Sequence, residues 1–111
     1  MVEKWLDIVK GSLEAGDEMQ YHWDVQYDKK NGYLVLSKKK VLFVEEHGLL
    51  HKTATLILDD PYKNISKTEI VRNQLELIDA DGARRIFNTN YSLIIQTKLE
   101  DLRKQAVPES R

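Results

Sequence analysis

The sequence contains no cysteine, which excludes a disulfide framework, a thiolate nucleophile and every metal site that needs a Cys ligand. Glycine and proline are scarce, with 5 and 2 residues among 111, so the chain is neither a low-complexity linker nor a disordered tail. Net charge is nearly absent as well, because 17 Lys and Arg offset 18 Asp and Glu. No overall field therefore draws the protein to nucleic acid or to an anionic membrane, and such binding would need a local patch.

Long apolar runs are also missing, and none approaches the roughly 18 residues that span a bilayer. Charges at Glu3, Lys4 and Asp7 argue against a secretory signal peptide. We therefore expect a cytoplasmic protein without a transmembrane segment. What is present is a mixture of 41% hydrophobic and 32% charged residues, which is typical of one folded globular domain of this size.

The two ends of the chain have helical periodicity. Near the N-terminus, apolar residues recur at helical spacing before Gly16, at Val2, Trp5, Leu6, Val9 and Leu13. Near the C-terminus, Tyr91, Ile95, Leu99, Leu102 and Ala106 share one helical face before Pro108. Both segments are predicted to be amphipathic helices.

The middle of the chain alternates with a period of two residues, which indicates half-buried strands. Strands are predicted over residues 21–28, 33–37, 41–46, 53–58, 74–79 and 84–88. The first of these has an aromatic inner face made of Tyr21, Trp23, Val25 and Tyr27. Asn31-Gly32 is expected to form the first hairpin turn, and Asp79-Ala80-Asp81-Gly82 to form the last. In the strand over residues 53–58, Ala54, Leu56 and Leu58 are expected on one face.

The stretch from Tyr62 to Val71 is ambiguous on local grounds, because Ser66 and Glu69 fit a helical capping box while a strand is also compatible with the pattern. Its neighbours favour a strand.

A resemblance to a known family rests on apolar positions and turns. The segments Gly32-Tyr33-Leu34-Val35-Leu36-Ser37 and Val41-Leu42-Phe43-Val44 resemble the second and third strands of GRAM and other pleckstrin-homology-like domains. Pro61 to Ile70 is similar to the fifth strand of that family, with Asn64 where an acidic residue is commoner, and Asn73 to Leu77, Gly82 and Ile86-Phe87 are similar to the sixth and seventh. The resemblance covers residues 20–106.

This resemblance implies a mainly β (α+β) fold, in which a single bent antiparallel barrel of about seven strands is capped by the C-terminal helix. The aromatic face of the first strand and the apolar face of the last helix would then share one core. The chain divides into an N-terminal helix over residues 1–16, the barrel with its C-terminal helix over residues 17–107, and a tail over residues 108–111.

Five lysines are the candidate anion-binding residues. Since family members that bind phosphoinositides use basic residues near the first loop, these lysines could form one cationic rim for anionic lipid: Lys29, Lys30, Lys38, Lys39 and Lys40. The second strand has no inward basic residue for a phosphate, however. The alternative is that these lysines are solvated side chains that protect the sheet edges.

The apolar stripe of the N-terminal helix, formed by Val2, Trp5, Leu6 and Val9, must also be buried somewhere. Two alternatives stand: the stripe packs on its own barrel, or it binds a partner or a second copy of the chain.

No set of residues suggests catalysis or a cofactor. His47 and His51 are spaced as a helical zinc pair, but the intervening Gly48 and the lack of a third ligand argue against a metal site. The paired acids Glu45-Glu46 and Asp59-Asp60 would point to opposite faces of a strand. We therefore expect a non-catalytic binding module for a protein partner or for itself. Anionic-lipid binding through the lysine loops is the alternative, and an enzyme with a pocket in the barrel mouth ranks third.

Overall fold

The structure is a computed structural model and describes residues 4–48 and 52–106. The elements follow in the order α1 (Lys4–Ser12), β1 (Met19–Tyr27), β2 (Lys30–Ser37), β3 (Lys40–His47), β4 (Thr53–Pro61), a short 3-10 helix η1 (Tyr62–Asn64), β5 (Ile65–Val71), β6 (Gln74–Asp79), β7 (Arg84–Asn88) and α2 (Ser92–Ala106). The predicted mainly β fold with a C-terminal helix is therefore confirmed. The ambiguous stretch is the short helix η1 followed by β5.

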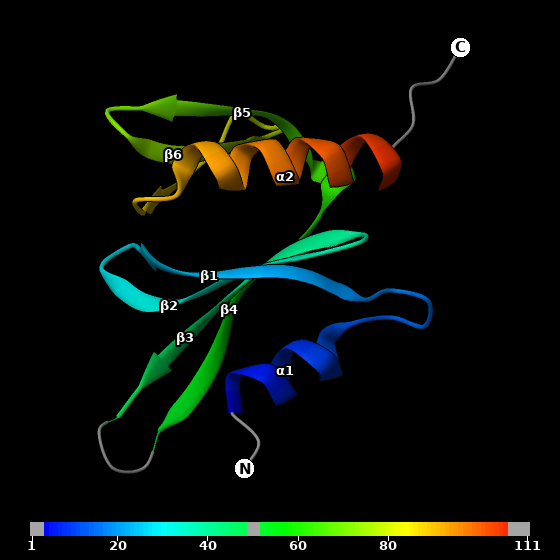
Figure 1. Ribbon diagram of the computed structural model, residues 1–111, viewed down its shortest axis with the longest axis vertical. Helices are drawn as coiled ribbons and strands as arrows, with labels where there is room; N and C mark the ends of the chain where they lie inside the picture. The colour runs from blue at the N-terminus through cyan, green and yellow to red at the C-terminus, as the bar shows by residue number, and fades with distance from the viewer. Residues whose placement is uncertain (1–3, 49–51, 107–111) are drawn as a thin grey trace.

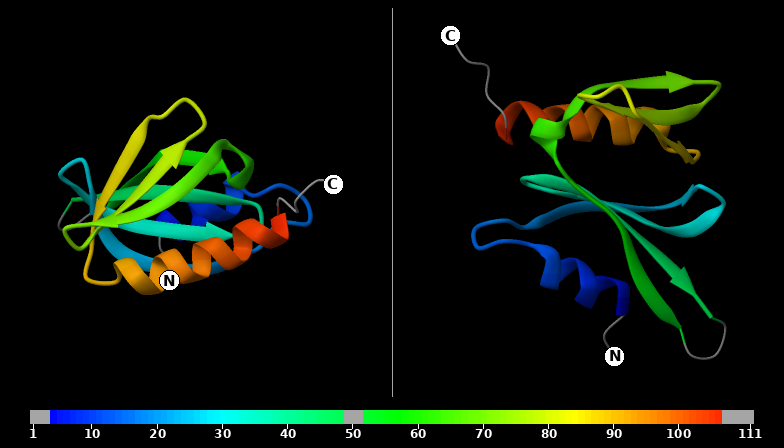
Figure 2. Two further views of the ribbon diagram at one scale, coloured as in Figure 1. Left: turned by 90° about the horizontal axis from the view of Figure 1, so that it is seen from above. Right: turned by 180° about the vertical axis from the view of Figure 1, so that it is seen from behind.

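The seven strands form one antiparallel sheet in the order β4-β3-β2-β1-β7-β6-β5. β1 pairs with β2 along its length but with β7 only at Gln26 and Tyr27, so the sheet opens into two wings, β1–β4 and β5–β7. Figures 1 and 2 show these wings diverging from a shared region. Within the described residues no ladder joins the edge strands β4 and β5, so the sheet is open.

The two helices lie on opposite sides of the middle strands (Figure 1). α2 closes the main core between the wings, where Ile95, Leu99 and Leu102 are buried with Val25. Trp23 and Tyr27 pack against this core, so the predicted pairing of the first strand with the last helix is confirmed for these residues. Tyr21 and Tyr91 are exceptions, because their side chains are 36% and 51% exposed.

The first hairpin turn lies three residues before its predicted position. Asp28 and Lys29 both have positive φ, 52° and 64°, and Asn31-Gly32 belongs to β2. A two-residue turn at Asn31-Gly32 would have placed Val25 opposite Lys38, whereas the observed register places it opposite Gly32 and inside the core. The prediction was wrong because burial on the sheet face set the register and outweighed the local turn preference.

Gly32 is required for a different reason. A Cβ atom on this residue would lie 2.1 Å from the carbonyl oxygen of Val44 on the neighbouring strand. Its role is therefore close strand approach, not turn formation.

β4 differs from its predicted pattern as well. Phe43 pairs with Leu58 but the next residue, Val44, pairs with Leu56, so Ile57 is an extra residue in a β-bulge. Leu58 consequently enters the main core while Leu56 faces α1. The expectation that both lie on one face was wrong.

Candidate interaction surfaces

The five candidate lysines do not form one rim. Lys29 and Lys30 lie at the turn that begins β2, whereas Lys38 and Lys39 follow its other end and Lys40 begins β3. With a rise of about 3.3 Å per residue, this strand separates the two groups by roughly 23 Å. The expectation of a single cationic rim is corrected, because the lysines are close in sequence only through an extended strand.

Several of these lysines already have partners. Lys30 Nζ lies 3.3 Å from an oxygen of Asp28, and Lys38 Nζ lies 3.1 Å from an oxygen of Glu18. Both pairs are at the surface, where such contacts contribute little. These two cations are nevertheless partly neutralised locally.

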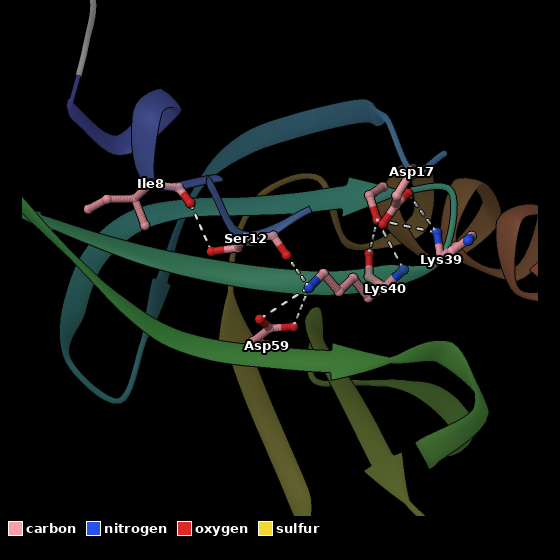
Figure 3. A network of polar contacts seen from close by, with 7 residues as sticks. Ile8, Ser12, Asp17, Lys39, Lys40 and Asp59 are labelled. Atoms are coloured by element: carbon pink, nitrogen blue, oxygen red, sulfur yellow. Dashed lines mark hydrogen bonds and ion pairs between the residues drawn. The ribbon is translucent and has the colours of Figure 1, made fainter. Parts of the chain in front are cut away.

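Lys40 is part of a buried polar network that joins α1 to the sheet (Figure 3). Its side chain is only 10% exposed, and Nζ lies 3.1 Å from a carboxylate oxygen of Asp59. The same ammonium donates to the main-chain carbonyl of Ser12, the last residue of α1. A cation at this position satisfies a free helix carbonyl and complements the helix dipole. Lys40 therefore has a structural role that its neighbours in sequence lack.

Asp17 provides the second part of this network. Its carboxylate accepts hydrogen bonds from the hydroxyl of Ser37 at 2.8 Å and from the main-chain N–H of Lys39 at 3.2 Å. The Tyr62 hydroxyl in turn donates to the carbonyl of Ser37 at 2.6 Å. Burial, helped by the charge of Asp17, raises the pKa of Tyr62 well above its usual range. Sequence reasoning missed this network, since Asp17 lies between predicted elements and has no periodic pattern.

The apolar stripe of α1 is buried against its own chain. Trp5 and Val9 are 3% and 0% exposed, and Trp5 stacks on Tyr33 with ring centroids 4.2 Å apart. Leu6 is half-buried against the same cluster, and Val2 lies outside the described residues. The structure thus favours intramolecular packing for this stripe, and in this arrangement Trp5 and Val9 offer no free surface.

A different apolar surface lies at the start of α2. Tyr91, Leu93 and Ile94 are 51%, 69% and 52% exposed, and we call these three residues the α2 patch. The buried face of the helix is formed by Ser92, Ile95 and Leu99, so the α2 patch is not needed for the core. Sequence analysis assigned Tyr91 to the core face and did not single out Leu93 or Ile94, although two adjacent large apolar residues beside that face were a usable signal.

A polar groove lies where β7 separates from β1, and we call it the β1–β7 groove. It is lined by Asp24, Val25 and Gln26 of β1, Asn31, Gly32 and Tyr33 of β2, Glu46 of β3, and residues 88–91 before α2. Gln26 and Asn31 are neighbours across the strands, and their side-chain amides are 3.4 Å apart. Tyr91 belongs to both this groove and the α2 patch, so the two surfaces are continuous.

Asp60 and His47, which belong to motifs considered in the sequence, are in structural contacts. Asp60 pairs with Arg85 at 3.3 Å, and burial raises the pKa of Asp60 while the nearby charge of Arg85 acts against the rise. The two ring nitrogens of His47 each lie 3.1 Å from a threonine hydroxyl, and His51 is outside the described residues. Across residues 4–48 and 52–106, no three His, Asp or Glu side chains are placed to hold a metal ion.

No helix in the described part of the chain is long and apolar enough to cross a membrane.

These features define a class of fold: an open, bent, seven-stranded antiparallel sheet with a C-terminal helix over its core and an N-terminal helix on the other side. In fold, the chain is similar to the C-terminal domain of an unknown protein from Leishmania infantum, with a TM-score of 0.66 over 88% of this chain and 96% of that one. The two sequences are 14% identical, so the likeness concerns the fold alone. No protein-family model matches the sequence, and no curated protein is significantly similar to it.

Proposed function

We propose that this protein is a non-catalytic binding module with a pleckstrin-homology-like fold, and that it mediates protein–protein interaction, foremost self-association. The observation that carries this proposal is the α2 patch, where Tyr91, Leu93 and Ile94 are each more than half exposed at the N-terminal end of the helix. Adjacent large apolar residues on a surface are typical of protein contact sites.

The hydrogen bonds that hold α2 on the sheet support the α2 patch as a docking surface. The Ser92 hydroxyl donates to the carbonyl of Asn73 at 2.7 Å, and Arg103 donates to the carbonyl of Ile65 at 2.7 Å. These bonds hold both ends of the helix against the β5–β7 wing. A partner would therefore meet a surface that is already ordered, which lowers the entropic cost of binding.

The pleckstrin-homology-like assignment is supported by the order of elements. A meander of β1–β4 and a second meander of β5–β7, followed by a helix over the shared core, agree with the family pattern implied by residues 20–106. The sheet is open, so the barrel of that family stays a proposal, in which the two wings bent around the core would be its counterpart.

Binding to anionic lipid is the weaker proposal. It would have to use two separate lysine groups, and Lys40 is committed to the network with Asp59 and Ser12. Liposome sedimentation of a variant with Lys29, Lys30, Lys38 and Lys39 replaced by Gln tests it, because lipid binding that needs these charges would be lost at low salt. Lys40 is left intact so that folding is not disturbed.

Sedimentation equilibrium tests self-association through the α2 patch. We expect the wild type to form dimers, and the double variant Leu93→Ser/Ile94→Ser to weaken the dimer by about tenfold or more, because central apolar contacts dominate such interfaces. Asp101→Ser, an exposed change on the same helix, is the matched control and should leave the equilibrium unchanged. A wild type that stays monomeric at about 100 μM, far above the range of specific dimers, contradicts self-association.

A further inference from the structure

We propose that the free edge of β1, together with the β1–β7 groove, binds an extended segment of a partner protein that carries a lysine or arginine side chain. This inference rests on the proposed function of a protein-binding module and specifies how, and to what chemistry, the module would bind.

The first observation is an incomplete ladder. β1 pairs with β2 from Met19 to Tyr27, but on its other side it meets β7 only at Gln26 and Tyr27. Residues 19–25 therefore have no strand partner on that side within the described part of the chain. A strand edge of this kind presents main-chain donors and acceptors in a row, and an extended peptide can pair with them.

The second observation concerns the helix that borders this edge. α2 is hydrogen-bonded to β5, where Arg103 and Glu100 contact Ile65 and Thr68. On the β1 side, α2 packs through the apolar core around Val25, and at the surface Lys98 Nζ lies 5.2 Å from the ring centre of Tyr21. An ammonium over an exposed ring is easily displaced. The β1 side of α2 is thus the more open side of the helix.

Aromatic side chains accompany the edge. The rings of Tyr21 and Trp23 are stacked at 5.8 Å, with Tyr21 exposed and Trp23 half-buried. Every second residue of an added strand would point to the same face of the sheet as these rings. Tyr and Trp are enriched at protein interfaces because they combine a large apolar area with a polar tip.

The chemistry of the β1–β7 groove selects a cationic residue. Its lining includes the carboxylates of Asp24 and Glu46 and the amides of Gln26, Asn31 and Asn88, and none of its lining residues is Lys or Arg. Glu46 is 3.7 Å from the exposed Lys52, whereas Asp24 is exposed on the rim. An anion would find no balancing charge here, but a guanidinium or ammonium would meet carboxylate and amide acceptors together.

The β1–β7 groove lies beside both the free edge of β1 and the α2 patch. It lies at Asp24 and Val25, the point at which β7 leaves β1, and it borders Tyr91 of the α2 patch. A segment that continues the sheet along β1 from this point would place one side chain in the groove and its neighbours near the apolar residues of α2. The preferred segment is therefore extended, apolar at alternate positions, and basic at one position.

The test begins with selection from a phage-displayed library of random nine-residue peptides on the folded wild-type protein. We expect the selected peptides to be enriched in Lys or Arg among β-branched and aromatic residues. In fluorescence anisotropy, Asp24→Asn should lower the affinity for the selected peptide by about tenfold. The affinity of the wild type should also fall as the salt concentration is raised. Asp101→Asn, which removes an exposed charge of the same kind on α2, should have no effect.

Amide chemical shifts then locate the peptide. We expect changes at residues 19–25 and 88–91. A library that yields no binder, selected peptides without a basic residue, equal affinities for the two Asp variants, or shifts confined to other residues would overturn the inference. An alternative is that the amides and tyrosines of the groove bind a neutral sugar, and titration with chitotriose tests this. Saturable shifts at the same residues on adding chitotriose would also overturn the inference.

The two proposals fail separately. A monomeric wild type that still selects basic peptides removes self-association and leaves the β1 edge as the binding site. A dimer that depends on Leu93 and Ile94 but selects no basic peptide retains the proposed function and removes this inference.

Discussion

Replacing Lys40 by methionine should destabilise the fold far more than the same change at Lys39, its neighbour in sequence. Methionine keeps most of the apolar stem and removes only the ammonium group. At position 40 this leaves the Asp59 carboxylate and the Ser12 carbonyl without their shared partner. At position 39 the side chain is exposed, and the main-chain N–H that binds Asp17 is retained.

The magnitude follows from what remains unpaired. Removing one partner of a fully buried ion pair costs about 3–5 kcal/mol, but the Asp59 side chain is 35% exposed and can regain water. An unsatisfied helix carbonyl costs about 1–3 kcal/mol, and the loss of a cation at the end of a helix adds about 0.3–1 kcal/mol. We expect a loss of about 2–3 kcal/mol in the free energy of unfolding for Lys40→Met, against about 0.5 kcal/mol or less for Lys39→Met.

Urea unfolding followed by far-ultraviolet circular dichroism measures both variants. Trp5 fluorescence in a Trp23→Phe background reports separately on the docking of α1, because Trp5 belongs to that helix and is buried against the sheet. The midpoint should fall for Lys40→Met with an unchanged slope. The free energies of unfolding of the two lysine variants should differ by more than about 1 kcal/mol, because substitutions at exposed sites usually cost far less than those at buried ones. A smaller difference would mean that the network does not hold α1 to the sheet.

Three further predictions concern the core. Trp5→Ala should lower the free energy of unfolding by about 3–5 kcal/mol. Trp5→Phe should lower it much less, because Nε1 of Trp5 is buried with no hydrogen-bond partner in the described structure, and thermal unfolding compares the two variants. Tyr62 has a folded pKa above the ordinary value of 10.0, so its stabilising contribution is complete below pH 10 and is lost as the pH rises further; absorbance at alkaline pH should show it ionising last, together with unfolding. Gly32→Ala should cost about 2 kcal/mol or more in urea, because its Cβ would meet the Val44 carbonyl, and a neutral result would refute that contact.

The sequence was sufficient for elements whose local and global preferences agree. β6 and β7 occupy the residues predicted for them, 74–79 and 84–88, because alternation, a glycine turn and burial all favour the same register. Gly82 has the positive φ of 90° that this turn needs.

Predictions failed where a distant contact decided the local structure. Asn31-Gly32 is a strong turn dipeptide, yet the register that buries Val25 moves the turn to Asp28-Lys29. The bulge at Ile57 likewise sends Leu56 to α1 and Leu58 to the main core, a division that alternation cannot reveal. Both errors come from packing partners that are far away in the chain.

The same limit applies to the candidate site. Lys38, Lys39 and Lys40 are identical residues in a row, and only the arrival of α1 and Asp59 makes Lys40 structural. The sequence-based prediction placed the candidate interaction surface on the N-terminal helix, whereas Trp5 and Val9 are buried and the exposed apolar residues Leu93 and Ile94 lie on α2. Which helix keeps a free surface depends on how much sheet each helix must cover.

The geometry of the two helices supports placing the proposed binding surface on α2 rather than on α1. α1 has 9 residues, and its apolar stripe is used up on the outer face of β2 and β3 by Trp5 and Val9. α2 has 15 residues, and its buried face already closes the core through Ile95, Leu99 and Leu102, which leaves Leu93 and Ile94 outside it. A partner on α1 would have to displace core side chains and expose apolar sheet, whereas a partner on α2 or along β1 would add contacts to a domain that stays folded. Binding on α2 or along β1 is therefore compatible with the stability of the fold.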